Sequence, residues 1–191
     1  MKAALLISSV IVGLSAIALA GNLSNENNEK VVKPGKFYGL IVNSGSNVIL
    51  TQGEENTYRV EGEKSEVEKI SAEVENGALV IRAADVNHST IYVTVKDINL
   101  IDVSGNGRVF VIGSIRSDII LLKVNDHGSI CADVQVMKVG LLARDSGKII
   151  VSGRASESLV KLSGEGIIYK KGLDILSEEA ELSPIEIENI N

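Results

Sequence analysis

The chain repeats one short pattern, in which two stretches of alternating apolar and polar residues flank a turn of small or polar residues. Such alternation on both sides of a turn predicts a strand, a turn and a second strand. One residue marks the turn of each copy, and these residues lie 30, 30, 21, 19 and 19 positions apart. They are Asn47, Gly77, Gly107, Gly128, Gly147 and Gly166. We expect a positive φ at this place, because Gly and Asn tolerate one better than other residues.

Apolar residues hold fixed places relative to the turn residue. An aliphatic residue follows it by two positions in every copy: Ile49, Leu79, Val109, Ile130, Ile149 and Ile168. Another precedes it by six positions in the last four copies: Ile101, Leu122, Leu141 and Val160. One copy cannot bury its apolar face alone, whereas copies stacked at a period of roughly 20 residues bury one continuous core. The pattern therefore predicts an all-β solenoid, a parallel β-helix with coils of that length.

A β-sandwich is the alternative fold. Its hairpins would also give strand, turn and strand, but they would not require identical columns at fixed spacing, so the columns favour the solenoid. The two longer spacings predict longer loops between the first coils, with Glu61–Glu68 and Ala84–Thr90 as the candidate segments.

The first twenty residues have the features of a secretory signal peptide. Lys2 is the only charge before Asn22, an apolar stretch follows it, and Ala18-Leu19-Ala20 forms an A-x-A cleavage site. We therefore predict a signal peptide over 1–20, a polar linker over 21–36, the repeat domain over 37–172 and a C-terminal cap over 173–191. In that cap, Ile185, Ile187 and Ile190 are placed to cover the last coil.

Composition excludes several classes of protein. Lys and Arg number 19 against 25 Asp and Glu, a net charge of −6, which argues against a nucleic-acid partner. Aromatic residues are only 3% of the chain, which argues against an aromatic platform that stacks bases or sugars. The single cysteine, Cys131, excludes a disulfide scaffold. No nucleotide, metalloprotease or calcium-repeat motif is present, so we expect no cofactor and no metal.

Several segments together resemble a known bacterial family. They are the Phe37 to Gly53 opening, the Leu79-Val-Ile-Arg82 and Ile91-Tyr-Val-Thr-Val-Lys96 stretches, and the Val103-Ser-Gly-Asn-Gly107 turn. The chain is similar, over about Phe37 to Lys171, to the putative auto-transporter adhesin head (GIN) domain family, whose function is not established. The resemblance implies a secreted, right-handed β-helical domain, and it supplies no catalytic or binding residues.

Stacked turns would bring several polar side chains to one edge. Equivalent turn positions of neighbouring coils lie about 5 Å apart in such a fold. The speculative binding set on this turn ladder is Asn106, Asp126, His127, Arg144, Asp145 and Glu165. Carboxylates beside a basic residue suit an acidic polysaccharide or a cation, although the same residue types are ordinary turn formers in solvent, which is the interpretation we favour.

A second apolar column follows the turn residue by three positions. It contains Leu50, Val80, Phe110, Cys131, Ile150 and Tyr169. We expect this column to be buried, with Cys131 as a small core residue. If it faces outward instead, Phe110, Ile150 and Tyr169 form an apolar contact stripe for protein or lipid.

The predicted function is an exported domain of the bacterial cell envelope or surface, located in the periplasm, on the outer surface or outside the cell. It acts as a non-catalytic, adhesin-like binding module, and not as an enzyme. The alternatives are a polysaccharide-processing β-helix enzyme and a self-associating structural envelope protein. The expected partners are an envelope or surface protein or a glycan, or a second copy of the chain. No stable membrane span is expected after signal cleavage.

Overall fold

The computed structural model describes residues 28–83, 89–170 and 172–181, so the predicted signal peptide lies outside the described residues. Within these ranges the chain forms strands and one short helix. In chain order the elements are β1 (Asn28–Val32), β2 (Gly39–Ser44), β3 (Asn47–Gln52), β4 (Thr57–Gly62), α1 (Lys64–Val67), β5 (Ile70–Glu75), β6 (Ala78–Ala83), β7 (Thr90–Val95), β8 (Leu100–Ser104), β9 (Arg108–Val124), β10 (Ser129–Ala143), β11 (Lys148–Leu162), β12 (Ile167–Tyr169) and β13 (Leu173–Glu181). No helix of the described segments has the length and apolarity that a membrane crossing needs.

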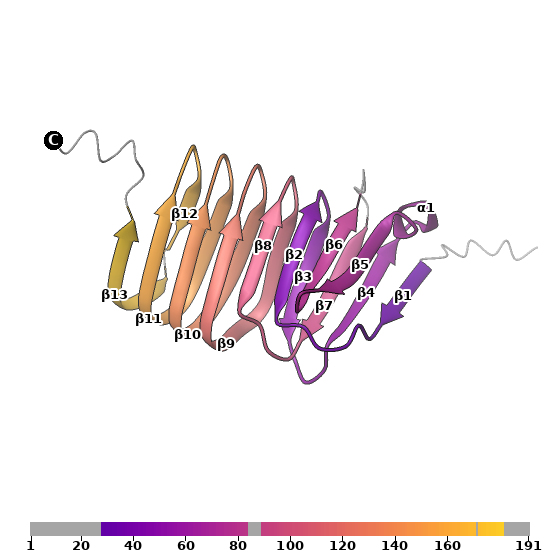
Figure 1. The fold of residues 1–191 in the computed structure, drawn as a ribbon, viewed down its shortest axis with the longest axis horizontal. Helices are drawn as coiled ribbons and strands as arrows, with labels where there is room; N and C mark the ends of the chain where they lie inside the picture. Colours follow the sequence, from indigo (N-terminus) through magenta and orange to yellow (C-terminus); the bar gives the residue numbers. More distant parts are fainter. Residues whose placement is uncertain (1–27, 84–88, 171, 182–191) are drawn as a thin grey trace, which may run out of the picture.

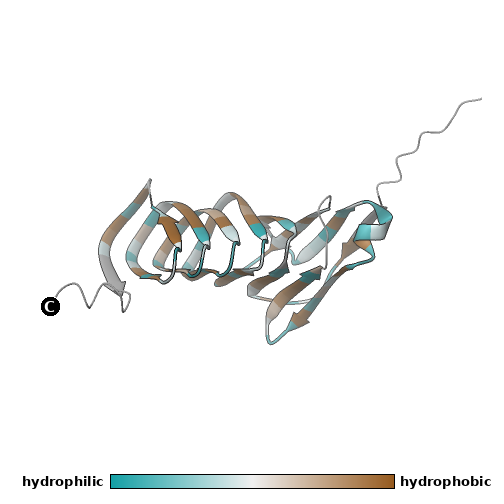
Figure 2. Cartoon of the chain, turned by 90° about the horizontal axis from the view of Figure 1, so that it is seen from above, coloured by the Kyte–Doolittle hydropathy of each residue, from teal (hydrophilic) through white to brown (hydrophobic). Residues whose placement is uncertain are grey.

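The described strands join into one curled, mixed sheet (Figure 1). Each coil has two walls: the pre-turn wall is made by β2, β6, β8, β13 and the later parts of β9–β11. The post-turn wall is made by β3, β7, β12 and the earlier parts of β9–β11. Figure 2 shows the coils from above as successive loops stacked along the long axis of the molecule. The sheet curls rather than forming a sandwich, so the sandwich alternative is wrong.

Parallel pairing at the predicted period holds throughout the second half of the chain. Val109 of β9 pairs with Ile130 of β10, which pairs in turn with Ile149 of β11. These offsets of 21 and 19 residues equal the spacings of the sequence copies. The all-β class is confirmed, whereas a right-handed parallel β-helix for the whole domain stays a prediction.

The first half departs from the predicted sequential stack. In space, β2 lies between β6 and β8, and β3 lies between β7 and β9, so the first coil in sequence is the second coil in the stack. The copy marked by Gly77 is an antiparallel hairpin of β5 and β6. Asn76 and Gly77 both have positive φ there, as a two-residue Asn-Gly hairpin turn requires.

The inward column holds where the coils are regular. Val109, Ile130 and Ile149 are buried as predicted, but Ile49 is not in this column. Val48 pairs with Val109 and is fully buried, because the turn of the first coil falls one residue earlier than the sequence alignment assumed. Leu79 is buried on the pre-turn wall, where it pairs with Leu40.

The expected positive φ is present at Gly77, but the turn glycines of the later coils, Gly107, Gly128, Gly147 and Gly166, do not have one, so the prediction was wrong for them. Positive φ falls two residues before each of them, at Gly105, Asp126, Asp145 and Gly164. A Cβ at Gly128 would meet the Val103 Cγ1 atom at 2.9 Å, and one at Gly147 would meet the Val124 Cγ1 atom at 2.8 Å. Gly128 and Gly147 therefore each let one turn approach a buried valine of a neighbouring coil.

The ends of the domain carry more strand than predicted. Within the proposed linker, β1 pairs antiparallel with β4. Within the proposed cap, β13 continues the parallel register on β11, from Gly153↔Leu173 to Lys161↔Glu181. The predicted Glu61–Glu68 loop contains the end of β4 and the helix α1. Most of the second predicted loop, Ala84–Thr90, lies outside the described residues. The same holds for all of 182–191, which includes Ile185, Ile187 and Ile190.

Candidate functional site

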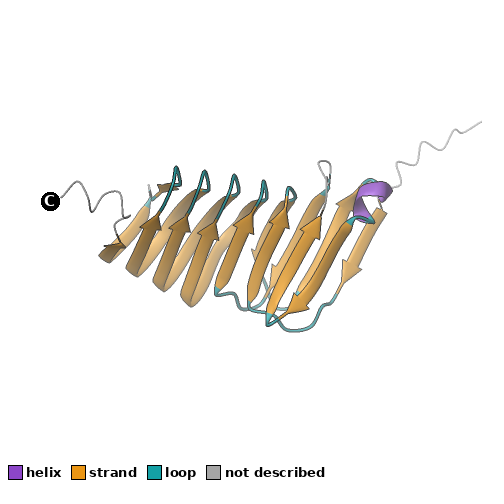
Figure 3. Ribbon diagram, turned by 45° about the horizontal axis from the view of Figure 1, so that its top comes forward, coloured by secondary structure: helices purple, strands orange, loops and turns teal. Residues whose placement is uncertain are grey.

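The predicted turn ladder lies along one edge of the coils, where Figure 3 shows the turns as a row of loops. Backbone hydrogen bonds stack these turns directly on one another. The His127 amide donates to the Gly105 carbonyl at 3.0 Å, and the Ser146 amide donates to the Asp126 carbonyl at 2.9 Å. Equivalent turn positions therefore meet as the sequence predicted.

The two ladder carboxylates face backbone amides of the neighbouring turn. Asp126 Oδ2 accepts a hydrogen bond from the Gly105 amide at 2.9 Å, and Asp145 Oδ2 accepts one from the Asp126 amide at 3.5 Å. Both aspartates have positive φ, at 56° and 55°, which Asp tolerates better than most residues. These contacts give Asp126 and Asp145 a structural role in joining successive turns.

The other ladder residues do not converge on one centre. Asn106 and His127 line a shallow polar hollow with Asn47 and Arg108. Among the described residues, neither the Arg144 nor the Glu165 side chain makes a hydrogen bond or an ion pair, and both are exposed. The part of the chain that the structure describes contains no group of three or more His, Cys, Asp and Glu side chains that could hold a metal ion. The six residues are thus neighbours along an edge and not a single site.

Substitutions at Asp126 test this structural role. We expect Asp126→Ala to lower the free energy of unfolding by about 1–2 kcal/mol, because it removes the hydrogen bond and leaves a less tolerant residue at positive φ. Asp126→Gly removes the same bond but relieves the backbone, so it should cost less than about 1 kcal/mol. Asp126→Asn keeps an acceptor oxygen and should stay within about 0.5 kcal/mol of the wild type. Urea unfolding measures all three, and an Asn variant as unstable as the Ala variant would contradict this role.

A row of apolar side chains crosses the outer face of the post-turn wall. Ile49 pairs with both Tyr92 and Phe110, and the same register continues through β10, β11 and β12. This row, here the outer stripe, consists of Tyr92, Ile49, Phe110, Cys131, Ile150 and Tyr169. Six strands about 4.8 Å apart give it a length of about 24 Å.

Four residues of the predicted second column lie in the outer stripe, namely Phe110, Cys131, Ile150 and Tyr169, and they face outward. Phe110, Ile150 and Tyr169 are 45%, 40% and 48% exposed, and Cys131 is half-buried. The expected burial of this column was therefore wrong for the coils of β9–β12, and the outward alternative is the one observed. Only Leu50 and Val80 of the predicted column are buried, since the first two copies have a different register.

Aromatic residues are few but concentrated on this row. Three of the six aromatic residues of the chain stand in the outer stripe: Tyr92, Phe110 and Tyr169. The low aromatic content therefore does not exclude an aromatic contact surface, which depends on where the side chains gather. They share one register across the wall, where Ile49, Cys131 and Ile150 stand between them.

Cations border the outer stripe on the side nearer the turns. The neighbouring outward row, from β7 to β12, is Thr90, Asn47, Arg108, Ser129, Lys148 and Ile167, and it holds no carboxylate. Arg108 and Lys148 make no ion pair with a described residue. The Lys148 Nζ atom lies 5.1 Å from the centre of the Tyr169 ring. This border is positive in a chain whose net charge is −6.

The opposite end of the outer stripe is tied to β4. The guanidinium of Arg59 lies 4.3 Å above the Tyr92 ring and forms an ion pair with Glu61. Partial burial, followed by the hydrogen bond and the charge of Glu61, raises the pKa of the Tyr92 hydroxyl, while the charge of Arg59 lowers it. Tyr92 is therefore an uncharged and well-anchored end of the stripe at neutral pH.

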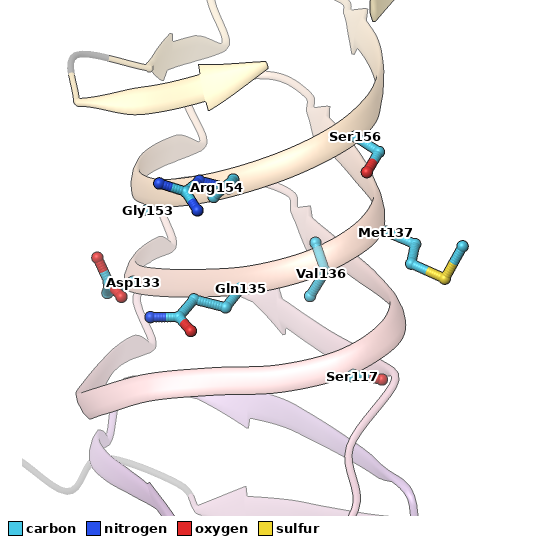
Figure 4. Close-up of a pocket in the computed structure, with 8 residues that line it drawn as sticks. All are labelled: Ser117, Asp133, Gln135, Val136, Met137, Gly153, Arg154 and Ser156. Atoms are coloured by element: carbon cyan, nitrogen blue, oxygen red, sulfur yellow. The ribbon is translucent and has the colours of Figure 1, made fainter. Parts of the chain in front are cut away.

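A separate polar groove follows the bend where β9, β10 and β11 pass from one wall to the other. Figure 4 shows one of its hollows, about 440 Å³ in volume, with Gln135 and Arg154 on the outer surface of successive coils. Its lining is Ser117, Asp133, Gln135, Val136, Met137, Gly153, Arg154 and Ser156. An adjoining hollow shares Ser117 and Gln135 and adds Asp97, Ile98, Arg116 and Asp118. The sequence analysis missed this bend groove, although Arg116, Gln135 and Arg154 are 19 residues apart, the coil period.

Comparisons with known proteins place the fold among adhesin-like domains. The family model described as "Putative auto-transporter adhesin, head GIN domain" matches residues 36–183, which confirms the resemblance seen in the sequence. No curated protein matches the chain.

Solved structures from Bacteroides and Parabacteroides species share the architecture at low sequence identity. A putative adhesin from Bacteroides fragilis has 18% identity and a TM-score of 0.76 over 82% of this chain and 76% of that one. A putative adhesin from Parabacteroides distasonis has 17% identity and a TM-score of 0.62 over 82% and 78%. A structure from the same species described as a putative lipid binding protein has 15% identity and a TM-score of 0.60 over 82% and 78%. At such identities these likenesses concern the fold alone.

Proposed function

The chain belongs to the head GIN domain family of putative auto-transporter adhesins, and we propose that it is a non-catalytic binding module that docks on a lipid surface through its outer stripe. The observation that carries this proposal is the register of outward-facing apolar side chains across six strands, of which Phe110, Ile150 and Tyr169 are exposed and the other three are half-buried. A contiguous exposed apolar row on a folded domain marks a contact surface. The same proposal includes export by the predicted signal peptide and a right-handed β-helical fold for the repeat domain.

Two features of the outer stripe favour lipid over other partners. Between its aromatic residues stand the aliphatic Ile49 and Ile150, which offer no ring face for stacking a sugar. The border with Arg108 and Lys148 complements an anionic headgroup layer, since each Lys or Arg near such a layer contributes about 1 kcal/mol. One structural neighbour is described as a putative lipid binding protein, which agrees with this choice without establishing it.

Catalysis is not part of this proposal. The enzyme alternative rested on the carboxylates of Asp126 and Asp145, and both of these accept backbone hydrogen bonds from a neighbouring turn. These hydrogen bonds between turns account for both carboxylates without a substrate. We therefore assign the turn ladder to folding and the outer stripe to binding.

Vesicle co-sedimentation tests the proposal with the purified exported chain. The wild type should bind vesicles of phosphatidylcholine with phosphatidylglycerol more tightly than vesicles of phosphatidylcholine alone. The triple variant Phe110→Ser, Ile150→Ser, Tyr169→Ser should bind the anionic vesicles at least tenfold more weakly, because it removes three half-exposed apolar side chains from the contact. The double variant Arg108→Gln, Lys148→Gln should lose the preference for anionic lipid while it keeps residual binding.

A matched control comes from the pre-turn wall. Ile119 and Leu159 are 54% and 44% exposed there, so the double variant Ile119→Ser, Leu159→Ser removes comparable apolar surface away from the outer stripe. This control should bind vesicles as the wild type does. The lipid proposal fails if the wild type does not bind anionic vesicles, or if the triple variant and the control weaken binding equally. In that case, sedimentation velocity of the same proteins would show whether the outer stripe instead joins two copies of the chain into a dimer.

A further inference from the structure

The bend groove repeats one polar position on three successive coils. Arg116 of β9 pairs with Gln135 of β10, and Gln135 pairs with Arg154 of β11. Because neighbouring strands lie about 4.8 Å apart, the Cα atoms of Arg116 and Arg154 are about 10 Å apart along the groove. The two hollows that these residues line share Ser117 and Gln135, so they lie next to each other along the stack.

The three side chains are held differently. The Arg116 backbone is fixed by Gln52, whose side chain accepts from the Arg116 amide at 2.8 Å and donates to the Arg116 carbonyl at 3.0 Å. The Arg116 Nε atom then donates to the Gln135 Oε1 atom at 3.4 Å. Arg154 is exposed and makes no ion pair with a described residue. The groove therefore presents one oriented guanidinium, one amide and one guanidinium available to a ligand.

The floor and the rim complete a mixed polar surface. Gly153 and the buried Val136 form a floor without a projecting polar group. Asp133 stands at the rim, where its carboxylate accepts a hydrogen bond from the Ser152 hydroxyl at 2.9 Å. Asp97 and Asp118 line the adjoining hollow. A ligand in this groove thus meets donors and acceptors together, with the cations about 10 Å apart and carboxylates near them.

We propose that the bend groove binds an extended acidic glycan that carries one carboxylate on every second sugar. A pyranose unit in an extended chain advances by a length close to one coil spacing, so a carboxylate on alternate sugars matches Arg116 and Arg154 on alternate coils. The amide of Gln135 and the carboxylate of Asp133 suit the hydroxyl groups of the intervening sugar. A polymer charged at every unit, such as a nucleic acid, would meet Asp97, Asp118 and Asp133 and be repelled.

Titration calorimetry with a hyaluronan octasaccharide tests this assignment, because that glycan has a carboxylate on alternate sugars. The wild type should bind it at least tenfold more tightly than a neutral N-acetylglucosamine oligosaccharide of equal length. Arg154→Gln should weaken hyaluronan binding by about tenfold to a hundredfold, as expected for one lost hydrogen-bonded ion pair. Arg154→Lys should fall between these values, because it keeps the charge and loses the planar fork.

Arg144→Gln is the matched control, since Arg144 is exposed at a turn and does not line the groove. It should bind the octasaccharide as the wild type does, and thermal unfolding of each variant verifies that the fold is retained. Absent binding by the wild type, equal binding of the neutral oligosaccharide, or equal losses in the Arg154 and Arg144 variants would overturn the assignment. The groove and the outer stripe share no residue, so neither this result nor the vesicle result depends on the other.

Discussion

Replacing Gly153 with alanine is expected to lower the free energy of unfolding by about 3–5 kcal/mol. Gly153 has a φ of +107°, which an alanine adopts only with strain. An added Cβ would also lie 2.0 Å from the Val134 carbonyl oxygen and 2.8 Å from the Val134 amide nitrogen. These contacts are backbone atoms of the neighbouring coil, so they cannot move aside as a side chain would. Backbone strain and the steric clash therefore act together at the bend of β11.

Two other glycines separate these causes. A Cβ on Gly77 meets nothing within 4 Å, although φ there is +79°, so Gly77→Ala should cost only the backbone strain of about 1–2 kcal/mol. Gly45 has open space and no positive φ, so Gly45→Ala should leave stability within about 0.5 kcal/mol of the wild type. Urea unfolding of the three variants should rank them in this order. A Gly153 variant no less stable than the Gly77 variant would refute the close approach of β10 and β11 at the bend.

The repeated spacing was enough to predict stacked parallel strands in the second half, because each coil there places the same residue type at the same position. Register in the first half was not predictable in this way. The alignment on Asn47 places Ile49 inward, whereas the whole first copy pairs one residue earlier, with Leu40 beside Ile101 and Val48 beside Val109, so that Val48 points inward. A shift of one residue reverses every side chain of a strand, so an error of one residue in the register exchanges core and surface. The Asn76-Gly77 hairpin signal was present in the sequence and was not used.

The outer stripe shows why alternation alone could not identify the contact surface. In β9, β10 and β11 both faces are apolar at the start of the strand: Val109 beside Phe110, Ile130 beside Cys131, and Ile149 beside Ile150. A pattern of consecutive apolar residues is typical of a strand buried on both faces. Only the curl of the sheet decides that one member of each pair fills the core and that the other is left in solvent. The sequence could therefore offer both arrangements and not choose between them.

The turn ladder failed as a site for a different reason. Its residues stack as expected, but a pattern of side chains does not reveal backbone amides as partners. The carboxylates of Asp126 and Asp145 accept hydrogen bonds from those amides. In the sequence, a carboxylate bound in this way looks the same as a carboxylate that is open to a ligand. The bend groove was missed because its polar residues lie inside long strands. There the coil period of 19 residues, applied to Arg116, Gln135 and Arg154, was the available signal.

Truncation of Leu122 to alanine is the second change with a large expected effect. Leu122 is fully buried and stands in register between Ile101 and Leu141, in the middle of the inward column of the pre-turn wall. Loss of a buried leucine side chain typically costs 2–5 kcal/mol, and we expect a value in about this range. Each coil contacts mainly its immediate neighbours, so the cavity weakens the interfaces with the coils on both sides.

This position also determines how the molecule should unfold. In a stack held by nearest-neighbour interfaces, weakening a central interface allows the two ends to unfold separately. Hydrogen exchange of the Leu122→Ala variant should therefore show early loss of protection in β8, β9 and β10 while β11 stays protected for longer. Ile119→Ala is the control, because Ile119 is 54% exposed on the same strand and should change stability by less than about 1 kcal/mol. Uniform loss of protection along all strands would show instead that the coils unfold as one cooperative unit, in which case local packing at one coil governs the stability of the whole stack.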